Sequence, residues 1–368
     1  MDELLKSPLH DRHEAAGARF AEFGGWLMPL QYTGIIAEHN ACRQGAAVFD
    51  VSHLGKVSVT GSGAVDFVNS CLSNDLNRIG AGQAQYTLAC NETGGVVDDM
   101  IAYRKSDENV FLVPNAANTA RVVALLQAAA PASIRIENQH RDFAVLAVQG
   151  PNSDAILKAL ALPVGHDYMG FTVAEFSNAE LICCRTGYTG ERGYELIVPA
   201  EVAGLLWDAI LEAGVDFGLV SAGLGARDTL RTEMGYALHG HELSETISGL
   251  EARVSWAIGW KKQAFWGKDA LLAEKSATAK RQLVGLIATG KAIPRPDMNV
   301  VALDSEQPIG VVTSGTFSPS LQKGIALALL DTSTALLPEV GVQVRGRLEK
   351  FEISAPPFIP AKVRESAG

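Results

Sequence analysis

Two adjacent acids in a strand that reads as buried are the clearest sign of chemistry in this sequence. Residues 91–100, N-E-T-G-G-V-V-D-D-M, begin with turn-forming residues and continue as an apolar strand towards Tyr103. Side chains alternate along a strand, so Asp98 and Asp99 should point to opposite faces. The predicted faces carry Val97, Asp99, Ile101 and Tyr103 on one side and Val96, Asp98, Met100 and Ala102 on the other. An unpaired buried carboxylate is costly, so at least one of the acids needs a partner or has a catalytic role.

A glycine-rich turn at residues 185–196, R-T-G-Y-T-G-E-R-G-Y-E-L, could hold a flat ligand. Glycine recurs there every third residue, at Gly187, Gly190 and Gly193. Such glycines let the backbone approach a ligand closely, and Tyr188 offers a stacking face. The carboxylate of Glu191 or Glu195 could accept two parallel N–H bonds from a heterocycle such as a pterin or guanine. The simpler alternative is that each glutamate is a solvated hairpin charge.

A second glycine-rich turn, residues 223–228 (G-L-G-A-R-D), begins like a dinucleotide-binding fingerprint. Asp228 stands where that fingerprint needs Gly or Ala, which argues against a nucleotide site. We expect a tight turn that delivers Arg227 near a helix N-terminus, where a negative or polar ligand group is favoured. The alternative, a structural ion pair between Arg227 and a nearby acid, stays open from the sequence alone.

The histidines indicate metal or triad chemistry only weakly. His239 and His241 have the H-x-H spacing of a zinc half-site, but the sequence nearby offers no convincing further ligands. We therefore predict polar loop histidines and no metal. His53 lies close to Asp50 and Ser52, but no serine lies in the G-x-S-x-G turn of a hydrolase. A hydrogen-bonded turn histidine is the stronger interpretation.

The elements that must position these residues alternate irregularly between helix and strand. Helices are predicted at residues 10–23, 35–45, 63–72, 115–129, 153–160 and 201–214, and after the turn at 223–228. Residues 23–34, rich in Gly and Pro, are predicted to form a loop. The irregular order argues against a doubly wound sheet and indicates an α+β fold. From about residue 282 short strands predominate, which predicts a small C-terminal β-barrel or sandwich.

Composition narrows the class of protein further. The 368 residues carry a net charge of −10, which opposes general binding to nucleic acid or to anionic membranes. The 5 cysteines are odd in number and lack C-x-x-C spacing, as expected for reduced thiols. The first residues lack the apolar segment of a signal peptide, and no uncharged apolar run approaches the ~20 residues of a membrane span. We therefore expect a cytoplasmic protein.

Several segments together resemble the glycine cleavage T-protein family. Members of this family are tetrahydrofolate-dependent aminomethyltransferases. The matching segments are F-G-G-W-L-M-P-L-Q-Y at 23–32, F-D-V-S-H-L-G at 49–55, N-E-T-G-G-V-V-D-D at 91–99, V-Q-G-P at 148–151, the turn at 185–196, A-G-L-G-A-R-D-T-L-R at 222–231 and T-S-G-T-F-S-P-S-L at 313–321. They follow the family's order and span almost the whole chain. The resemblance implies a cloverleaf of mixed α/β subdomains around a folate channel. Residues 1–272 would hold two interleaved α/β subdomains, and residues 282–365 would form a C-terminal β-barrel domain.

The same resemblance implies a reaction and the residues that carry it. A lipoyl arm of the partner H protein would carry an aminomethyl group on sulfur. The enzyme would release ammonia and pass the one-carbon unit to tetrahydrofolate, giving methylene-tetrahydrofolate. The family's catalytic aspartate falls on Asp99, and its pterin-holding residues fall on Glu195 and Arg227. Candidates for lining the channel are Tyr86, Tyr103, Asn115, Tyr188 and Tyr236.

Two related classes stay as alternatives. Folate-dependent demethylases share the scaffold and differ in the donor pocket. Non-catalytic folate-binding accessory proteins for iron–sulfur assembly carry K-G-C-Y-x-G-Q-E, where this chain has R-T-G-Y-T-G-E at 185–191 and keeps Asp99. The chain also departs from the T-protein pattern. Gly249 replaces proline, while Arg253 and Asp297 stand where the family has glycine, which puts local loop geometry in question.

Overall fold

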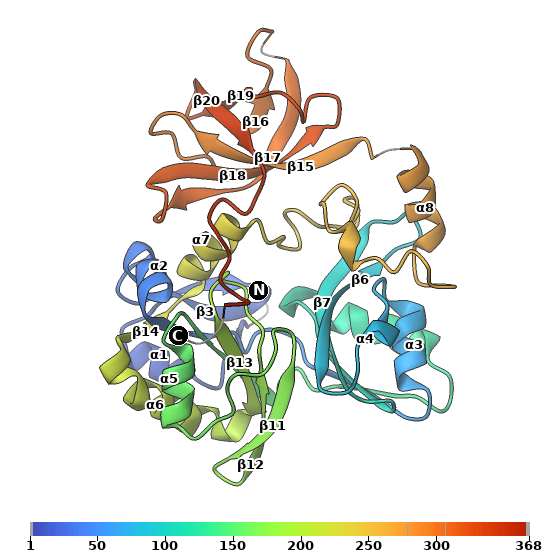
Figure 1. Cartoon of the computed structure of the whole chain (residues 1–368), viewed down its shortest axis with the longest axis vertical. Helices are drawn as coiled ribbons and strands as arrows, with labels where there is room; N and C mark the ends of the chain where they lie inside the picture. The colour runs from blue at the N-terminus through green and yellow to red at the C-terminus, as the bar shows by residue number, and fades with distance from the viewer. Residues whose placement is uncertain (1–2, 278, 306, 366–368) are drawn as a thin grey trace.

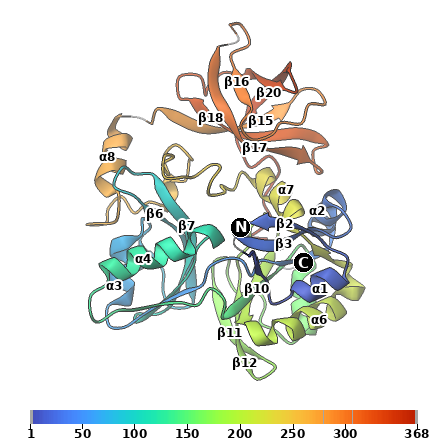
Figure 2. The ribbon, with the colours of Figure 1, turned by 180° about the vertical axis from the view of Figure 1, so that it is seen from behind.

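The computed structural model describes residues 3–277, 279–305 and 307–365, and its elements form three lobes around a shared centre (Figure 1). Two lobes are mixed α/β, and the third is a closed barrel at the C-terminal end of the chain. The view from behind shows the same three lobes, with the N-terminal strands near their meeting point (Figure 2). The predicted α+β fold with a C-terminal β-barrel is confirmed. Among all the residues that the structure describes, no helix is long and apolar enough to cross a membrane.

The first lobe is built on a mixed sheet whose strands come from two separate parts of the chain, residues 46–50 and residues 143–222. The strand order is β11 (Phe171–Phe176), β12 (Ala179–Cys184), β13 (Gly193–Pro199), β10 (Phe143–Gln149), β4 (Ala46–Asp50) and β14 (Leu219–Ala222). One face packs on α5 (Ser153–Ala159) and α6 (Ala203–Gly214), with Leu146 and Trp207 in the shared core. The other face packs on α7 (Leu224–Met234) and turns towards the centre. The N-terminal part adds β1 (Leu5–Lys6), α1 (His10–Ala15), β2 (Arg19–Phe23), β3 (Trp26–Gln31) and α2 (Ile35–Gln44).

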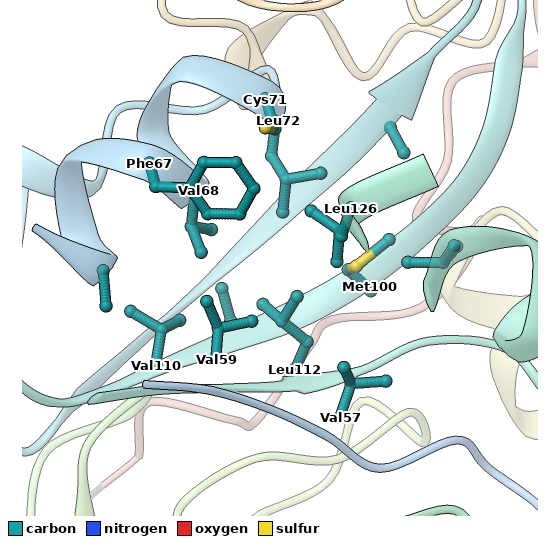
Figure 3. Close-up of a cluster of buried hydrophobic side chains, with 14 of the residues drawn as sticks. Val57, Val59, Phe67, Val68, Cys71, Leu72, Met100, Val110, Leu112 and Leu126 are labelled. Atoms are coloured by element: carbon teal, nitrogen blue, oxygen red, sulfur yellow. The ribbon is translucent and has the colours of Figure 1, made fainter. Parts of the chain in front are cut away.

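The second lobe inserts between β4 and β10 of the first. Its strand order is β6 (Gln83–Cys90), β7 (Val96–Ser106), β8 (Asn109–Val113), β5 (Val57–Thr60) and β9 (Arg135–Asn138). Helices α3 (Ala64–Cys71) and α4 (Thr119–Ala129) cover one face of this sheet. Figure 3 shows Phe67 and Val68 of α3 and Leu126 of α4 directed at apolar side chains of the strands. This core fixes β7, the strand that carries both acids.

The third lobe is the barrel. Its strands close in the order β15 (Arg281–Ala288), β18 (Lys323–Asp331), β17 (Pro308–Ser318), β16 (Asn299–Val301), β19 (Glu339–Val344) and β20 (Arg347–Ser354). Small and branched residues such as Leu286, Ala328 and Val342 fill its interior. Helix α8 (Lys268–Ala277) precedes the first barrel strand. We propose that residues 1–272 and 282–365 are the two domains of the chain.

The predicted alternation along β7 holds from Asp98 onwards and fails before it. Met100 packs in the core under α3 and α4, and Tyr103 packs in the core that faces the first lobe, so the two lie on opposite faces as predicted. Val97 joins the core of Met100, although strict alternation assigns it to the opposite face. The cause is a bulge, because the register of β6 against β7 shifts where β6 ends.

The predicted helix at 10–23 and loop at 23–34 are wrong in part. Helix α1 ends at Ala15, and the following residues form the antiparallel pair β2–β3. Gly24 and Gly25, which the sequence suggested were loop residues, form its turn with φ of 57° and 84°. Trp26 and Met28 are buried, so packing against the first lobe stabilises a strand in this segment.

Arg253 and Asp297, the two positions at which the resemblance implies glycine, both hold a left-handed backbone. Arg253 and Asp297 have φ of 59° and 67°. A side chain disfavours this conformation by roughly 1 kcal/mol, while glycine adopts it freely. We expect Arg253→Gly and Asp297→Gly each to raise the free energy of unfolding by about 0.5–1 kcal/mol, measured by urea denaturation. An equal gain in Lys291→Gly, an exposed position without positive φ, would contradict this explanation.

A buried carboxylate on α7 fastens the barrel to the first lobe. Glu233 accepts hydrogen bonds from the hydroxyls of Ser318 and Ser320. Its Oε2 lies 2.8 Å from Nη2 of Arg43 and 3.3 Å from Nε2 of His39. Burial would raise the pKa of Glu233, but His39, Ser318 and Arg43 outweigh it and lower the pKa to about 2.

Acid should therefore loosen the contact between barrel and first lobe. Because the pKa of Glu233 falls from 4.5 to about 2 on folding, its contribution to stability is present above pH 4.5 and lost as the pH falls towards 2. The full contribution is on the order of 3 kcal/mol. We expect Glu233→Gln to lower the free energy of unfolding at neutral pH and to flatten its loss below pH 4.5. Urea titrations at several pH values check this, and an unchanged pH slope in the variant would count against the role.

Candidate functional site

Both acids lie where β7 extends beyond its neighbour β8. The two strands pair only between Ile101 and Ser106 of β7, so the edge beside the acids is open to the loop that follows β8. Asn115 begins that loop. The side-chain nitrogen Nδ2 of Asn115 lies 2.8 Å from Oδ1 of Asp98 and 3.0 Å from Oδ1 of Asp99. One side chain therefore joins two acids that alternation sends to opposite faces.

Asp99 is half-buried and has a hydrogen-bond donor on each oxygen. The hydroxyl of Tyr86 donates to Oδ2 at 2.9 Å, and Asn115 donates to Oδ1. Trp256 packs on Tyr86 with ring centroids 5.3 Å apart, and it is 62% exposed. The carboxylate thus lies behind a pair of aromatic rings whose outer member faces solvent.

Burial raises the pKa of both acids. Burial and the charge of Asp99 raise the pKa of Asp98 to about 8, although amide donors oppose the shift. Burial also raises the pKa of Asp99, against the effects of Tyr86, His239 and Asn115. Two carboxylates this close resist carrying two full charges at once. Pairs of perturbed acids of this kind cluster at functional sites.

A second polar group lies in the first lobe, on β13 and α7. Glu195 is buried, and its Oε2 accepts a hydrogen bond from the hydroxyl of Thr186. Arg227 lies in the first turn of α7, as predicted, with its guanidinium carbon 4.7 Å from the ring centroid of Tyr188. Its Nη1 is buried and has no hydrogen-bond partner among the described residues. A buried carboxylate, an unsatisfied guanidinium and an aromatic face can together hold a flat polar heterocycle.

The remaining predicted residues lie around these two groups. The rings of Tyr188 and Tyr236 are 5.7 Å apart at 30°, and Tyr188 is within electrostatic reach of Asp99. Tyr103 lies deeper, with its hydroxyl 3.3 Å from that of Thr186. The structure thus brings the predicted residues to one region, where Tyr103 supports the Glu195 group from behind rather than facing Asp99.

The glycine-rich turn at 185–196 has a structural reason other than the predicted one. A Cβ on Gly190 would lie 2.0 Å from the sulfur of Met234, and the other two glycines would clash with Gln149. These glycines make room for buried side chains, so packing alone accounts for them, and close approach of a ligand at this turn stays a prediction. Glu191 is not a solvated charge either, because it is buried and lies 3.1 Å from Nη1 of Arg43.

The histidines meet the predictions in part. His239 and His241 lie in a loop, but their rings bond different strands, through Val96 O at 2.9 Å and Thr313 O at 2.8 Å. Within the described ranges, no group of three or more His, Cys, Asp or Glu could hold a metal ion. His53 lies in a turn, as predicted, but its buried Nδ1 has no hydrogen-bond partner in the part of the chain that the structure describes.

Some residues of the site went unrecognised in the sequence. Thr186 contacts Glu195, and Trp256 contacts Tyr86. No local sequence pattern encodes either contact. Asn118 carries a usable signal, since it follows Asn115 by three residues in the turn that opens α4. That spacing is typical of side chains that converge on one side of a helical turn.

A cavity of about 1140 Å³ opens on the other side of α7. Its lining includes Asp228, Arg231 and Arg295, but none of the residues predicted for the site. Asp228 pairs with Arg231 on that side of α7. Arg227 instead lies over the ring of Tyr188, towards the centre of the molecule. Helix α7 therefore separates this cavity from the acid and its aromatic neighbours.

Fold and site define a three-lobed protein in which a half-buried acid lies beside a group suited to a flat heterocycle. The GCVT N-terminal domain family matches residues 9–262, and the glycine cleavage T-protein C-terminal barrel domain matches residues 281–359. The chain is 58% identical to the aminomethyltransferase of Mycobacterium avium over 98% of this chain and 99% of that protein. It is 56% identical to the aminomethyltransferase of Frankia alni, over 99% of this chain and 100% of that protein. The crystal structure of glycine cleavage system aminomethyltransferase T from Bartonella henselae matches with a TM-score of 0.92 at 31% identity, over 98% of this chain and 99% of that one. The chain belongs to the glycine cleavage T-protein family.

Proposed function

We propose that this chain, an aminomethyltransferase of the glycine cleavage system, uses tetrahydrofolate as acceptor and the lipoylated H protein as donor. The one-carbon unit would pass from sulfur of the aminomethyl-lipoyl arm to tetrahydrofolate. The carbon–sulfur and carbon–nitrogen bonds of the arm would break, giving methylene-tetrahydrofolate, ammonia and the free thiol of the arm. In this proposal the reaction takes place in the cytoplasm, and Asp99 is the catalytic residue. Residues that bind tetrahydrofolate would be Tyr86, Tyr103, Asn115, Tyr188, Glu195, Arg227 and Tyr236, with Tyr103 acting from behind through Thr186.

The observation that carries the proposal is the buried guanidinium of Arg227 beside the buried carboxylate of Glu195, because its Nη1 has no hydrogen-bond partner among the described residues. A pterin offers acceptors for the first and a row of N–H donors for the second. The ring of Tyr188 supplies an apolar face between them. These residues therefore fit the heterocycle of tetrahydrofolate.

The position of Asp99 fits the chemistry of the transfer. Positive charge develops on the aminomethyl carbon as ammonia leaves it. A carboxylate already held by Tyr86 and Asn115 stabilises that charge without having to reorganise. The same oxygen can orient the attacking nitrogen or take its proton. The rings of Tyr86 and Trp256 would help to keep water from the reacting carbon.

A single assay tests the proposal. The purified chain is mixed with H protein loaded with the aminomethyl group, and methylene-tetrahydrofolate and ammonia are measured with and without tetrahydrofolate. We expect equal amounts of both products, formed only when all components are present. Tetrahydrofolate binding without turnover would favour the demethylase or the non-catalytic accessory class. Turnover with an N-methyl or O-methyl donor would then select the demethylase.

A further inference from the structure

Asp98 has a set of partners that the proposed reaction does not use. The residue is 0% exposed, and N–H donors surround its carboxyl group. The backbone N–H of Asn115 donates to Oδ2 at 3.0 Å. The side-chain amides of Asn115 and Asn118 both donate to Oδ1 at 2.8 Å. A buried acid is costly, so three donors on one side chain indicate a position that is held for a reason.

His239 holds the outer end of this arrangement. Its Nε2 lies 2.9 Å from the carbonyl oxygen of Val96, which can only accept, so Nε2 carries the ring hydrogen. Its Nδ1 is then the acceptor for the amide of Asn118, at 3.0 Å. The two hydrogens of the Asn118 amide are thus divided between His239 and Asp98. This division fixes which end of the Asn118 side chain faces Asp98.

Asn115 carries the arrangement inwards to the catalytic candidate. Its side-chain nitrogen contacts Oδ1 of Asp98 and, on Asp99, the backbone oxygen at 2.9 Å and Oδ1 at 3.0 Å. A rotated amide would present its oxygen to these acceptors instead. As long as Asp98 accepts from Asn115, the donor end is the one that faces Asp99.

We propose that Asp98 is a positioning residue for Asp99, acting through Asn115, and that His239 and Asn118 hold Asp98 in turn. The inference rests on the proposed catalytic role of Asp99. Asp98 does not touch the reacting atoms; it selects the orientation of the amide that fixes one oxygen of Asp99. Glu195 and Arg227, which carry the proposed contacts with the heterocycle, lie on other elements, so the affinity for tetrahydrofolate should depend little on Asp98.

The variant Asp98→Asn removes this function with little change in shape. An amide has one acceptor oxygen, so at least one of the three N–H donors meets another NH₂ group. Whichever way the new amide turns, its NH₂ group faces either the backbone N–H of Asn115 or the two side-chain amides. Asn115 is therefore displaced or reoriented, and Oδ1 of Asp99 loses a partner in fixed position. Small misplacements of a catalytic group commonly cost up to ~10²-fold in rate. We expect kcat to fall about 10- to 100-fold, while the KM for tetrahydrofolate changes less than about twofold.

The experiment compares steady-state kinetics of Asp98→Asn, Asn118→Ala and Asp208→Asn with loaded H protein and tetrahydrofolate. Asp208 lies in an exposed ion pair with Arg12, so its variant should keep the wild-type kcat. Asn118→Ala removes one donor to Asp98 and should lower kcat several-fold, with KM again unchanged. A thermal melt establishes that each variant is folded.

A normal kcat in folded Asp98→Asn would overturn the proposal. A raised KM with unchanged kcat would also overturn it, because Asp98 would then serve binding. If Asp98→Asn does not fold, Asn118→Ala decides, and a normal kcat there overturns the proposal. Full turnover by Asp99→Asn would instead remove the catalytic role on which the proposal stands, so the two failures are distinguishable.

Discussion

Replacing Asp99 by asparagine should remove most of the turnover and leave tetrahydrofolate binding intact. Asparagine has the size of aspartate, and its oxygen can still accept from Asn115. Its amide can donate to the hydroxyl oxygen of Tyr86, so the local geometry survives while the negative charge is lost. Groups that stabilise developing charge are typically worth ~10²- to 10³-fold in rate. We expect a fall of that size in the single-turnover formation of methylene-tetrahydrofolate.

The matched control for this experiment is Asp107→Asn. Asp107 follows the same strand, and its side chain is 84% exposed in a pair with Arg104. Exposed pairs contribute little, so this variant should keep both rate and stability. Tetrahydrofolate affinity, measured by calorimetry, should be similar in wild type and Asp99→Asn. Near-normal turnover by Asp99→Asn would refute the catalytic assignment, and a large loss of affinity would make Asp99 a binding residue.

The part of the fold that follows from short-range pattern could be predicted from the sequence. Helical periodicity identified α2 and α6. The change to short strands near residue 282 predicted a barrel or sandwich, and the structure has a barrel. The pair β2–β3 was missed because its glycines form a turn and its apolar residues are buried against elements far along the chain, such as α7 and β14. The side of β7 on which Val97 lies was missed because a bulge leaves no mark in the alternation of residue types.

The candidate site residues were predicted mainly from the family resemblance, and less from local pattern. Pattern alone showed that one of two adjacent acids must be compensated, but it could not choose between them, and the resemblance supplied Asp99. The reason lies in Asn115, which contacts both acids from the end of another strand. Contacts of this kind join residues that are far apart in sequence, so local spacing cannot reveal them. The packing reason for Gly190 could not be predicted for the same reason, since the side chain of Met234 that it accommodates comes from α7.

The second large effect is expected at Arg227. The variant Arg227→Met keeps most of the apolar stem and removes the guanidinium over the ring of Tyr188. It also leaves Glu195 buried without this neighbouring positive charge. Hydrogen bonds to charged groups contribute about 1.5–3 kcal/mol each, so the affinity for tetrahydrofolate should fall about 10- to 100-fold. Calorimetric titration with tetrahydrofolate measures this loss directly, without the H protein.

Two further variants decide what the loss means. Arg227→Lys keeps the charge but not the planar fork, so an affinity between those of wild type and Arg227→Met would indicate paired hydrogen bonds to the heterocycle. Arg295→Met removes a guanidinium from the cavity on the other side of α7, and it should leave the affinity unchanged. If Arg295→Met weakened tetrahydrofolate binding and Arg227→Met did not, the heterocycle would bind in that cavity. Nη1 of Arg227 has no partner in the residues that the structure describes, which argues for the centre, because a buried guanidinium nitrogen without a hydrogen bond is costly unless a ligand supplies one.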